Sequence, residues 1–235
     1  MKNPFKRPPT EKKPRTQSVF REYFELITET LVYVFFIMTF LLQSFVIPSP
    51  SMEDTLLIGD HLLVDKVAYS RSLTPLGKLL LPQKRIERGM IVTFKAPPDM
   101  EKEFVKRVIA LPGDTIRIVN KRVFLNGKPL NEPYTYFRDP QIENSFRDNF
   151  PDFTIPQGYY FCMGDNRDNS YDCRYWGPVP ADYIIGRPWR IYWSYESTSA
   201  EYLTPGVAHK ARDLFQTVLG FFQKTRWERT IRKII

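Results

Sequence analysis

Ser51 is a candidate nucleophile in the stretch IPSPSM, residues 47–52, which closes a long apolar run. A serine hydroxyl becomes nucleophilic only beside a base. Neither His61 nor His209 completes a convincing Ser-His-acid arrangement, and the patterns G-x-S-x-G, S-x-x-K and H-E-x-x-H are absent. A lysine base is the remaining option for this chemistry. The alternative is that Ser51 is an ordinary turn or cap residue.

Lys106 is the candidate base, in the stretch EFVKRVIAL that covers residues 103–111. If this stretch is a strand, Phe104 and Val108 share the face of Lys106, so its neighbours are apolar. Burial of this kind lowers the pKa of a lysine from about 10.4 toward neutrality, because it penalises the ammonium form. The alternative is a lysine at a strand edge that reaches water.

A dense polar segment, GDNRDNSYDCRYWG, covers residues 164–177 and contains three Asp, two Arg and two Asn. This composition predicts a network of ion pairs and hydrogen bonds. A solvated loop or a calcium loop is the alternative. Arg167 and Asn169 occupy positions that do not fit the calcium-loop spacing from Asp165. With two histidines and two cysteines in the whole chain, we expect no metal and no cofactor.

The segments that must position these residues have the pattern of short strands. Turn-forming Gly, Pro and Asn residues separate them, which predicts a mostly β domain. Strands are expected over 91–95, 103–111, 115–119, 123–125, 159–163 and 184–193, with strand character in 56–70. Residues 71–90 are expected to be an exposed loop, and residues 131–156 a loop-rich insertion.

An apolar segment precedes this domain. Fourteen of the seventeen residues from Leu31 to Ile47 are apolar, and no charge occurs from Thr30 to Met52. A helix over 30–47 would rise about 27 Å, close to a hydrocarbon core of about 30 Å. The first Gly is Gly59 and the first Ala is Ala68, so the small residues of a signal-peptide cleavage site are missing. We therefore expect a permanent transmembrane helix rather than a buried core helix.

The charges are concentrated at the two ends of the chain. The net charge of the chain is +8. Residues 1–22 and residues 210–235 each hold seven Lys or Arg and two acids, a net charge of +5 for each end. The middle of the chain therefore has a net charge of −2. A slightly acidic body does not favour nucleic-acid binding, and basic ends favour an anionic membrane. The basic residues before the apolar segment predict a cytoplasmic N-terminus.

The C-terminal stretch has the pattern of an amphipathic helix. Leu214, Phe215, Val218, Leu219 and Phe222 lie at helical spacing, with Lys and Arg in the same stretch. The apolar run is too short to span a membrane. A helix lying on the membrane, a helix packed on the body or a partner, and a frayed tail are the alternatives.

Taken in order, the apolar segment, PSPSM, KRVIALPGD and GDNRDNSYDCRYWG resemble bacterial type I signal peptidase, the leader peptidase family of Ser-Lys proteases, over roughly residues 20–195. The resemblance implies a signal-peptidase-like β catalytic domain with one N-terminal transmembrane helix. It implies a membrane-bound serine endopeptidase that removes signal peptides after small residues at −1 and −3. The implied partners are precursor proteins and membrane lipid. The implied location is the bacterial plasma membrane, with the catalytic domain on the extracytoplasmic face.

The same resemblance implies a role for each matching residue. Ser51 is the nucleophile, Lys106 the general base, and Ser170 the residue that orients the lysine. The Ser49 hydroxyl and the Ser51 N–H form the oxyanion hole. The supporting ion pairs are Asp172 with Arg174 and Arg107 with Asp165. The substrate pocket is formed by Ile47, Met52, Leu56, Phe104 and Val105 for the residue at −1, and by Phe45 and Leu62 for the residue at −3.

Three positions depart from the family pattern: Asp54 replaces Pro, Ala110 replaces Gly, and Cys173 replaces Ser or Gly. Cys173 and Cys162 both belong to the exported body and could form a disulfide. Two rival functions are a membrane-anchored peptide-binding β domain without catalysis and a specialised pilus or conjugation Ser-Lys peptidase. A third, a self-cleaving repressor, is disfavoured by the anchor and the acidic body.

We expect four segments along the chain. They are a cytoplasmic basic tail over 1–22, a transmembrane anchor over 23–47, an extracytoplasmic β catalytic domain over 48–196 with an insertion at about 115–160, and a basic amphipathic extension over 197–235.

Overall fold

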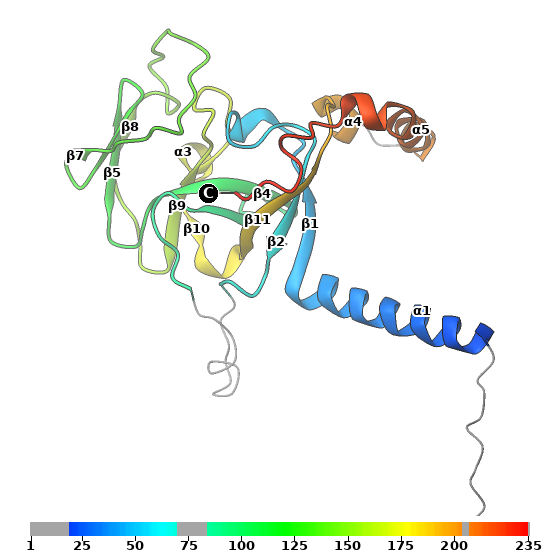
Figure 1. The fold of residues 1–235 in the computed structure, drawn as a ribbon. Coiled ribbons are helices and arrows are strands. Elements are labelled where there is room, and N and C mark those ends of the chain that lie inside the picture. Colours follow the sequence, from blue (N-terminus) through cyan, green and yellow to red (C-terminus); the bar gives the residue numbers. More distant parts are fainter. Residues whose placement is uncertain (1–18, 70–83, 204–206, 235) are drawn as a thin grey trace, which may run out of the picture. The chain divides into compact units, whose positions relative to one another are not determined.

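The computed structural model describes residues 19–69, 84–203 and 207–234 (Figure 1). The chain divides into two compact units, Met1–Ile37 and Met38–Ile235. Most of the predicted basic tail over 1–22, and most of the predicted exposed loop over 71–90, lie outside the described residues.

The first unit contains the helix α1, Val19–Phe36, none of whose residues is buried. With the π-helical turn Ile37–Leu41 it forms a 23-residue segment that is long and apolar enough to cross a membrane. At 1.5 Å per residue this segment rises about 35 Å. The helix begins at Val19, well before the apolar run, which starts near Thr30.

The prediction that the helix extends to Ile47 is wrong. Strand β1, Leu42–Val46, begins where the π-helical turn ends, and it pairs antiparallel with β2, Asp60–Asp65. The pairing sets Phe45 opposite Leu62. An apolar run is compatible with both helix and strand, and here the pairing of β1 with β2 decides for the strand.

The larger sheet confirms the prediction of a mostly β fold. Its strand order is β1-β2-β11-β3-β4-β9-β10, and every neighbouring pair is antiparallel. The remaining strands of this sheet are β3 (Ile91–Ala96), β4 (Asp99–Ala110), β9 (Tyr159–Met163), β10 (Val179–Pro180) and β11 (Ile184–Ser194). A single 3₁₀ turn, Ala181–Tyr183, connects β10 to β11.

A second sheet occupies the region predicted to be a loop-rich insertion. It has four strands in the order β7-β6-β5-β8. They are β5 (Thr115–Val119), β6 (Arg122–Leu125), β7 (Lys128–Pro129) and β8 (Phe150–Thr154). Asn120 and Lys121, both at positive φ, form the two-residue turn between β5 and β6. Strand β8 was not predicted, because Pro151 and Asp152 interrupt its apolar pattern; its pairing with β5 and the packing of Phe150 and Phe153 against the core hold it in place.

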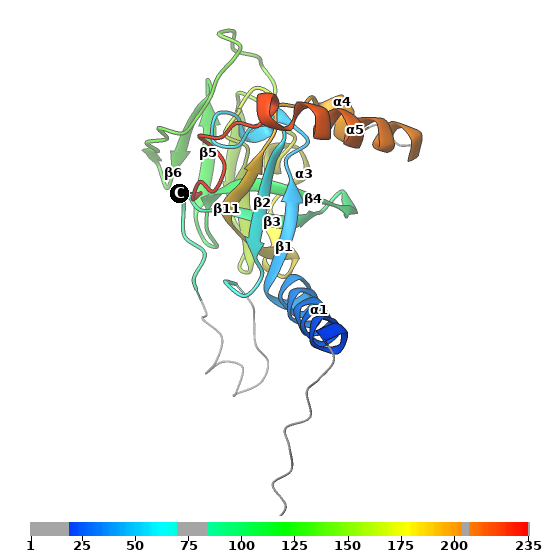
Figure 2. The ribbon, with the colours of Figure 1, turned by 45° about the vertical axis from the view of Figure 1, so that its right-hand side comes forward.

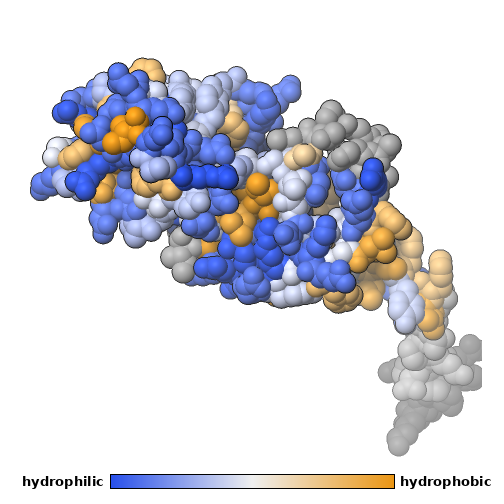
Figure 3. Space-filling model, turned by 90° about the horizontal axis from the view of Figure 1, so that it is seen from above, coloured by the Kyte–Doolittle hydropathy of each residue, from blue (hydrophilic) through white to orange (hydrophobic). Residues whose placement is uncertain are grey.

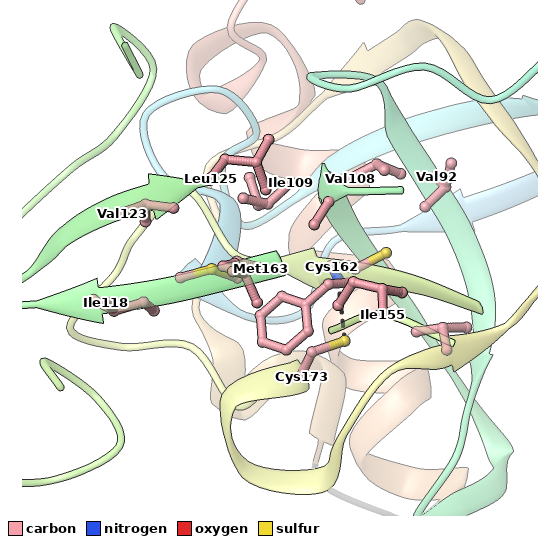
Figure 4. Packing of buried hydrophobic residues seen from close by; sticks show 14 of the residues in the cluster. Val92, Val108, Ile109, Ile118, Val123, Leu125, Ile155, Cys162, Met163 and Cys173 are labelled. Carbon is pink, nitrogen blue, oxygen red and sulfur yellow. Dashed lines mark hydrogen bonds between the residues drawn. The ribbon is translucent and has the colours of Figure 1, made fainter. Parts of the chain in front are cut away.

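The main hydrophobic core lies between the two sheets (Figure 4). Val108 and Ile109 from β4 pack with Ile118 from β5 and Cys162 from β9 in this cluster. Cys173, in the short helix α3 (Cys173–Trp176), also belongs to it. Both cysteines are free, and the backbone N–H of Cys162 donates a hydrogen bond to Sγ of Cys173 at 3.1 Å. The possible disulfide is therefore not formed.

The C-terminal extension contains two helices, α4 (Ser199–Leu203) and α5 (Val207–Lys224). Figure 2 shows them beside one another at the edge of the β body. The residues that follow, 225–234, return along β11 and are called the C-terminal strap here. Its contacts include bridges from Thr225 to Tyr195 and from Lys233 to Arg190. Near its end, Ile234 is buried against the core cluster that contains Ile47 and Met52.

Candidate active site

Ser51 lies in the 3₁₀ turn Pro50–Met52, which three connecting residues separate from the end of strand β1. Pro50 at the first position of the turn presets the backbone for it. The side chain is largely buried, with Ser51 9% exposed. The two ends of the surrounding segment are joined by backbone hydrogen bonds between Ile47 and both Gly59 and Asp60. The turn thus holds the Ser51 hydroxyl at a fixed position beside the sheet.

Lys106 lies on β4 and pairs with Val92 of β3. Its Nζ lies 2.5 Å from Oγ of Ser51 and 5.6 Å from the centre of the Phe104 ring. Burial lowers the pKa of Lys106 to about 8, and the nearby Asp172 carboxylate limits this decrease. A large fraction of Lys106 is therefore neutral near pH 8, and a neutral amine accepts a proton from a serine hydroxyl.

Two further serines lie near this pair. Oγ of Ser49 is 3.4 Å from Oγ of Ser51. Ser170 is buried, and within the described part of the chain its hydroxyl has no hydrogen-bond partner. The hydrogen bond from Ser170 to Lys106 that the family pattern implies is therefore not formed in this structure.

Gly164 allows Ser170 to approach Ser51. A Cβ built on Gly164 would lie 2.3 Å from Oγ of Ser170 and 2.4 Å from the carbonyl oxygen of Ser51. These two atoms therefore flank the same point in space, and no side chain fits between them. Glycine is required at this position because a side chain has no room, not because the backbone angle is unusual.

Asp172 and Arg174 form a buried, bidentate ion pair, with both N–O distances at 2.9 Å. Asp172 also caps α3 by accepting from the Arg174 N–H, and it accepts from the Gly164 N–H at 3.0 Å. Burial alone would raise the pKa of Asp172, but Arg174 and these hydrogen bonds hold it below its usual value. The carboxylate therefore remains charged beside Lys106.

Arg107 and Asp165 form a second buried, bidentate pair, with distances of 2.8 and 2.7 Å. Thr55 donates to the same carboxylate at 2.6 Å. The Arg107 guanidinium also donates to the carbonyl of Gly89 and stacks 4.0 Å from the Tyr134 ring. The pair therefore joins β4, the segment after Ser51 and the polar segment over 164–177.

Asn166 is a site residue that was not predicted individually. Its Nδ2 donates to the Pro50 carbonyl, and its backbone N–H donates to the Ser51 carbonyl. Its place in the polar segment was the only signal in the sequence.

Arg229 was also missed: it pairs with the buried Asp60 and donates to the Thr55 carbonyl. No local pattern connects residues this far apart in sequence.

A cavity of about 700 Å³ opens beside the Ser51 and Lys106 pair. Five of the seven predicted pocket residues line it: Phe45, Ile47, Met52, Phe104 and Val105. The other lining residues are Ser44, Val46, Pro48, Ser49, Pro50, Lys102, Glu103, Asn169, Tyr171 and Tyr202. Tyr202 comes from α4 in the C-terminal extension, which no pocket prediction included.

Leu56 and Leu62 do not line this cavity, so the prediction that they contact substrate is wrong. Both are fully buried. They pack with Ile47, Met52 and Val105 in one core cluster. Leu62 lies opposite Phe45 in the β1–β2 pairing, and Phe45 packs against the same cluster.

The departures from the family pattern leave the contact between Ser51 and Lys106 in place. Ala110 is buried in β4 opposite Phe161, and Cys173 accepts its hydrogen bond from the Cys162 backbone. Asp54 is exposed. Over residues 19–69, 84–203 and 207–234, no group of three or more His, Cys, Asp and Glu is arranged to hold a metal ion.

Comparisons with known proteins identify the family of this chain. The family model described as signal peptidase, peptidase S26, matches residues 20–193. The chain is similar to signal peptidase I of Pseudomonas aeruginosa, with 35% identity over 206 residues that cover 74% of this chain and 72% of the relative. It is similar to signal peptidase I of Aquifex aeolicus, with 34% identity over 233 residues that cover 76% of this chain and 85% of the relative.

A crystal structure of a signal peptidase I from Enterococcus faecalis is also similar, with 30% identity and a TM-score of 0.37, over 44% of this chain and 97% of that one. The family match covers β1, the Ser51 turn, β4 and the polar segment, which are the elements that build the site. The chain is therefore a peptidase that belongs to the peptidase S26 family, the signal peptidases.

Proposed function

We propose that this chain is a membrane-anchored serine endopeptidase that removes signal peptides from secreted precursors by a Ser51–Lys106 dyad. The observation that carries the proposal is the 2.5 Å contact between two buried groups, Nζ of Lys106 and Oγ of Ser51. The lowered pKa of Lys106, about 8, suits a general base that works near neutral pH.

The reaction is acyl transfer in two stages. Neutral Lys106 takes the Ser51 proton as Oγ attacks the scissile carbonyl, and the resulting ammonium gives that proton to the departing amine of the mature protein. The signal peptide is then esterified to Ser51. Lys106 takes a proton from water as the water attacks this ester, and Ser51 recovers a proton as the signal peptide leaves with a new carboxylate.

The oxyanion of each tetrahedral intermediate is stabilised by the Ser51 N–H and the Ser49 hydroxyl. The position of Ser49, 3.4 Å from Oγ of Ser51, supports this role. One such donor contributes about 3–4 kcal/mol to transition-state stabilisation. Ser170 orients Lys106 once its hydroxyl turns to bond Nζ, a bond that is not formed in this structure. The support for this role is that the buried Ser170 hydroxyl has no partner among the described residues and, like the Ser51 carbonyl, lies against Gly164.

The substrate binds as an extended strand beside residues 104–106 of β4. Small side chains at −1 enter the part of the cavity lined by Ile47, Met52, Phe104 and Val105, and the side chain at −3 lies near Phe45. The apolar lining and the closeness of Met52 to the nucleophile support a preference for small residues. Main-chain hydrogen bonds supply affinity in this mode, while pockets supply selectivity.

The protein is anchored in the bacterial plasma membrane by α1 and the following π-helical turn. The basic residues over 1–22 remain in the cytoplasm. The catalytic domain begins with β1 and functions on the extracytoplasmic face. It does not end near residue 196 as predicted, because the C-terminal strap packs into it through Arg229 and Ile234. The length and hydropathy of the segment Val19–Leu41 support this organisation. Anchoring holds enzyme and precursor in one membrane, which raises their effective concentration.

The test is cleavage, in detergent, of a secretory precursor with Ala at −3 and −1. We compare the unmodified protein, Ser51→Ala, Lys106→Ala and the control Lys95→Ala, which removes an exposed lysine on β3. We expect cleavage at the Ala-X-Ala site only by the unmodified protein and the control, with or without a chelator. Binding of the precursor without cleavage by any variant would favour a peptide-binding domain. Cleavage by Ser51→Ala or Lys106→Ala would refute the dyad.

A further inference from the structure

Helix α5 exposes a continuous row of large apolar side chains. Leu214, Phe215, Val218, Leu219 and Phe222 are each between 65% and 78% exposed. Their spacing places all five on one side of the helix. On the face shown in Figure 3, the β body is mostly hydrophilic, with its hydrophobic residues in a few patches. A contiguous exposed apolar face on a folded domain marks a contact surface.

The opposite side of α5 is packed on the β body, which fixes the direction of the apolar face. A Cβ built on Gly220 would lie 2.8 Å from the Tyr195 hydroxyl. The Phe221 and Trp193 rings are 5.9 Å apart, and Trp193 Nε1 donates to Thr225 at the end of the helix. The five apolar side chains therefore point away from the body.

An aromatic ring borders this face, and exposed basic residues lie on α5 and in the C-terminal strap. The Trp227 ring stacks on Phe222 at 6.3 Å and is half exposed. Arg212 and Lys224 are exposed near the two ends of the described side chains of α5. Arg232 and Lys233 are exposed in the C-terminal strap. An apolar helix face with an aromatic border and lysine or arginine beside it is typical of helices that lie in a membrane interface.

We propose that the apolar face of α5, defined by Leu214, Phe215, Val218, Leu219 and Phe222, lies in the headgroup and acyl boundary of an anionic bilayer. The net charge of +5 over residues 210–235 is attracted to anionic lipid and opposes contact with a second copy of the same face. The chain also has a segment, Val19–Leu41, that is long and apolar enough to span a membrane. The proposal makes α5 a membrane contact separate from that segment.

The full-length protein can report this contact through an environment-sensitive fluorophore attached to Val218→Cys. Cys162 and Cys173 are buried, so the label reacts with the introduced thiol. The matched control is Gln216→Cys, an exposed position on the other side of the same helix. Both proteins are reconstituted in vesicles of phosphatidylcholine and phosphatidylglycerol in equal amounts, with and without a quencher attached to the upper part of the acyl chains.

We expect a blue-shifted emission for the Val218→Cys probe and quenching at least about threefold stronger than for the control. Replacing phosphatidylglycerol by phosphatidylcholine should weaken both effects. Equal, weak quenching at the two positions would overturn the proposal. The proposal would also be overturned if labelled copies showed energy transfer to one another and the lipid quencher failed to reach the probe. A second copy of the protein, rather than lipid, would then cover the apolar face. The readout does not depend on peptidase activity, so it stands apart from the proposed function.

Discussion

The backbone N–H of Asn166 donates a hydrogen bond to the carbonyl oxygen of Ser51 at 3.2 Å. The Asn166 side chain donates to Pro50 at the same distance, so one residue holds the nucleophile turn by two bonds. The polar segment over 164–177 therefore does more than supply Ser170. It fixes the backbone that positions the Ser51 hydroxyl opposite Lys106, and errors of about 1 Å in such positions reduce rates strongly.

Gly164→Ala should reduce kcat/KM by at least about 100-fold, because its Cβ would displace the Ser51 carbonyl or Ser170. The measurement is precursor cleavage alongside circular dichroism of the same preparation. Gly220→Ala is the control for a crowded glycine outside the site, since its Cβ would meet the side chains of Tyr195 and Lys224 rather than backbone. Full activity of Gly164→Ala would mean that the close approach of these groups is unimportant for catalysis.

The pH profile of kcat/KM should rise about tenfold per pH unit below the Lys106 pKa and level off above it. The expected midpoint is near 8, because burial lowers the Lys106 pKa to about 8 and only the neutral amine accepts the Ser51 proton. Ser49→Ala should lower kcat about 100-fold or more without moving the midpoint, because it removes only an oxyanion donor. A midpoint near 10 would exclude a buried lysine base.

Arg107→Ala should destabilise the protein by about 3–5 kcal/mol, because it leaves the buried Asp165 carboxylate without its cation. Thermal unfolding in detergent measures this effect. The control is Arg117→Ala, which breaks an exposed pair with Asp152 at 3.9 Å and should cost less than about 1 kcal/mol. Equal effects of the two substitutions would show that burial of the Arg107 pair is irrelevant to stability.

Arg229→Ala should lower stability by about 2–3 kcal/mol and also reduce kcat/KM. Arg229 is the C-terminal strap residue that pairs with the buried Asp60 and donates to the carbonyl of Thr55, four residues after the nucleophile. Unfolding midpoints and cleavage rates are measured together, with the exposed Glu228→Ala as control. An unchanged cleavage rate in a destabilised Arg229→Ala protein would limit the strap to a structural role.

The sequence alone determined the family and most of the strands. The two histidines left lysine as the candidate base, and the order of the motifs along the chain singled out Ser51 and Lys106. The strand over 115–119 was predicted with its observed bounds, since its alternation and its turn are local features. The family resemblance came from motifs whose order along the chain is itself a sequence property.

Only the tertiary structure decided how far the apolar segment continues as a helix, because Leu42–Val46 is compatible with either structure until β2 pairs with it. It also decided that Leu62 is buried in a core cluster while Phe45 lines the cavity, because sequence patterns do not tell which of two apolar residues will be covered. The contacts of Asn166 with Ser51 and of Arg229 with Asp60 join distant segments. Such pairs depend on how the strands are arranged in space, and no local pattern of residues encodes that arrangement.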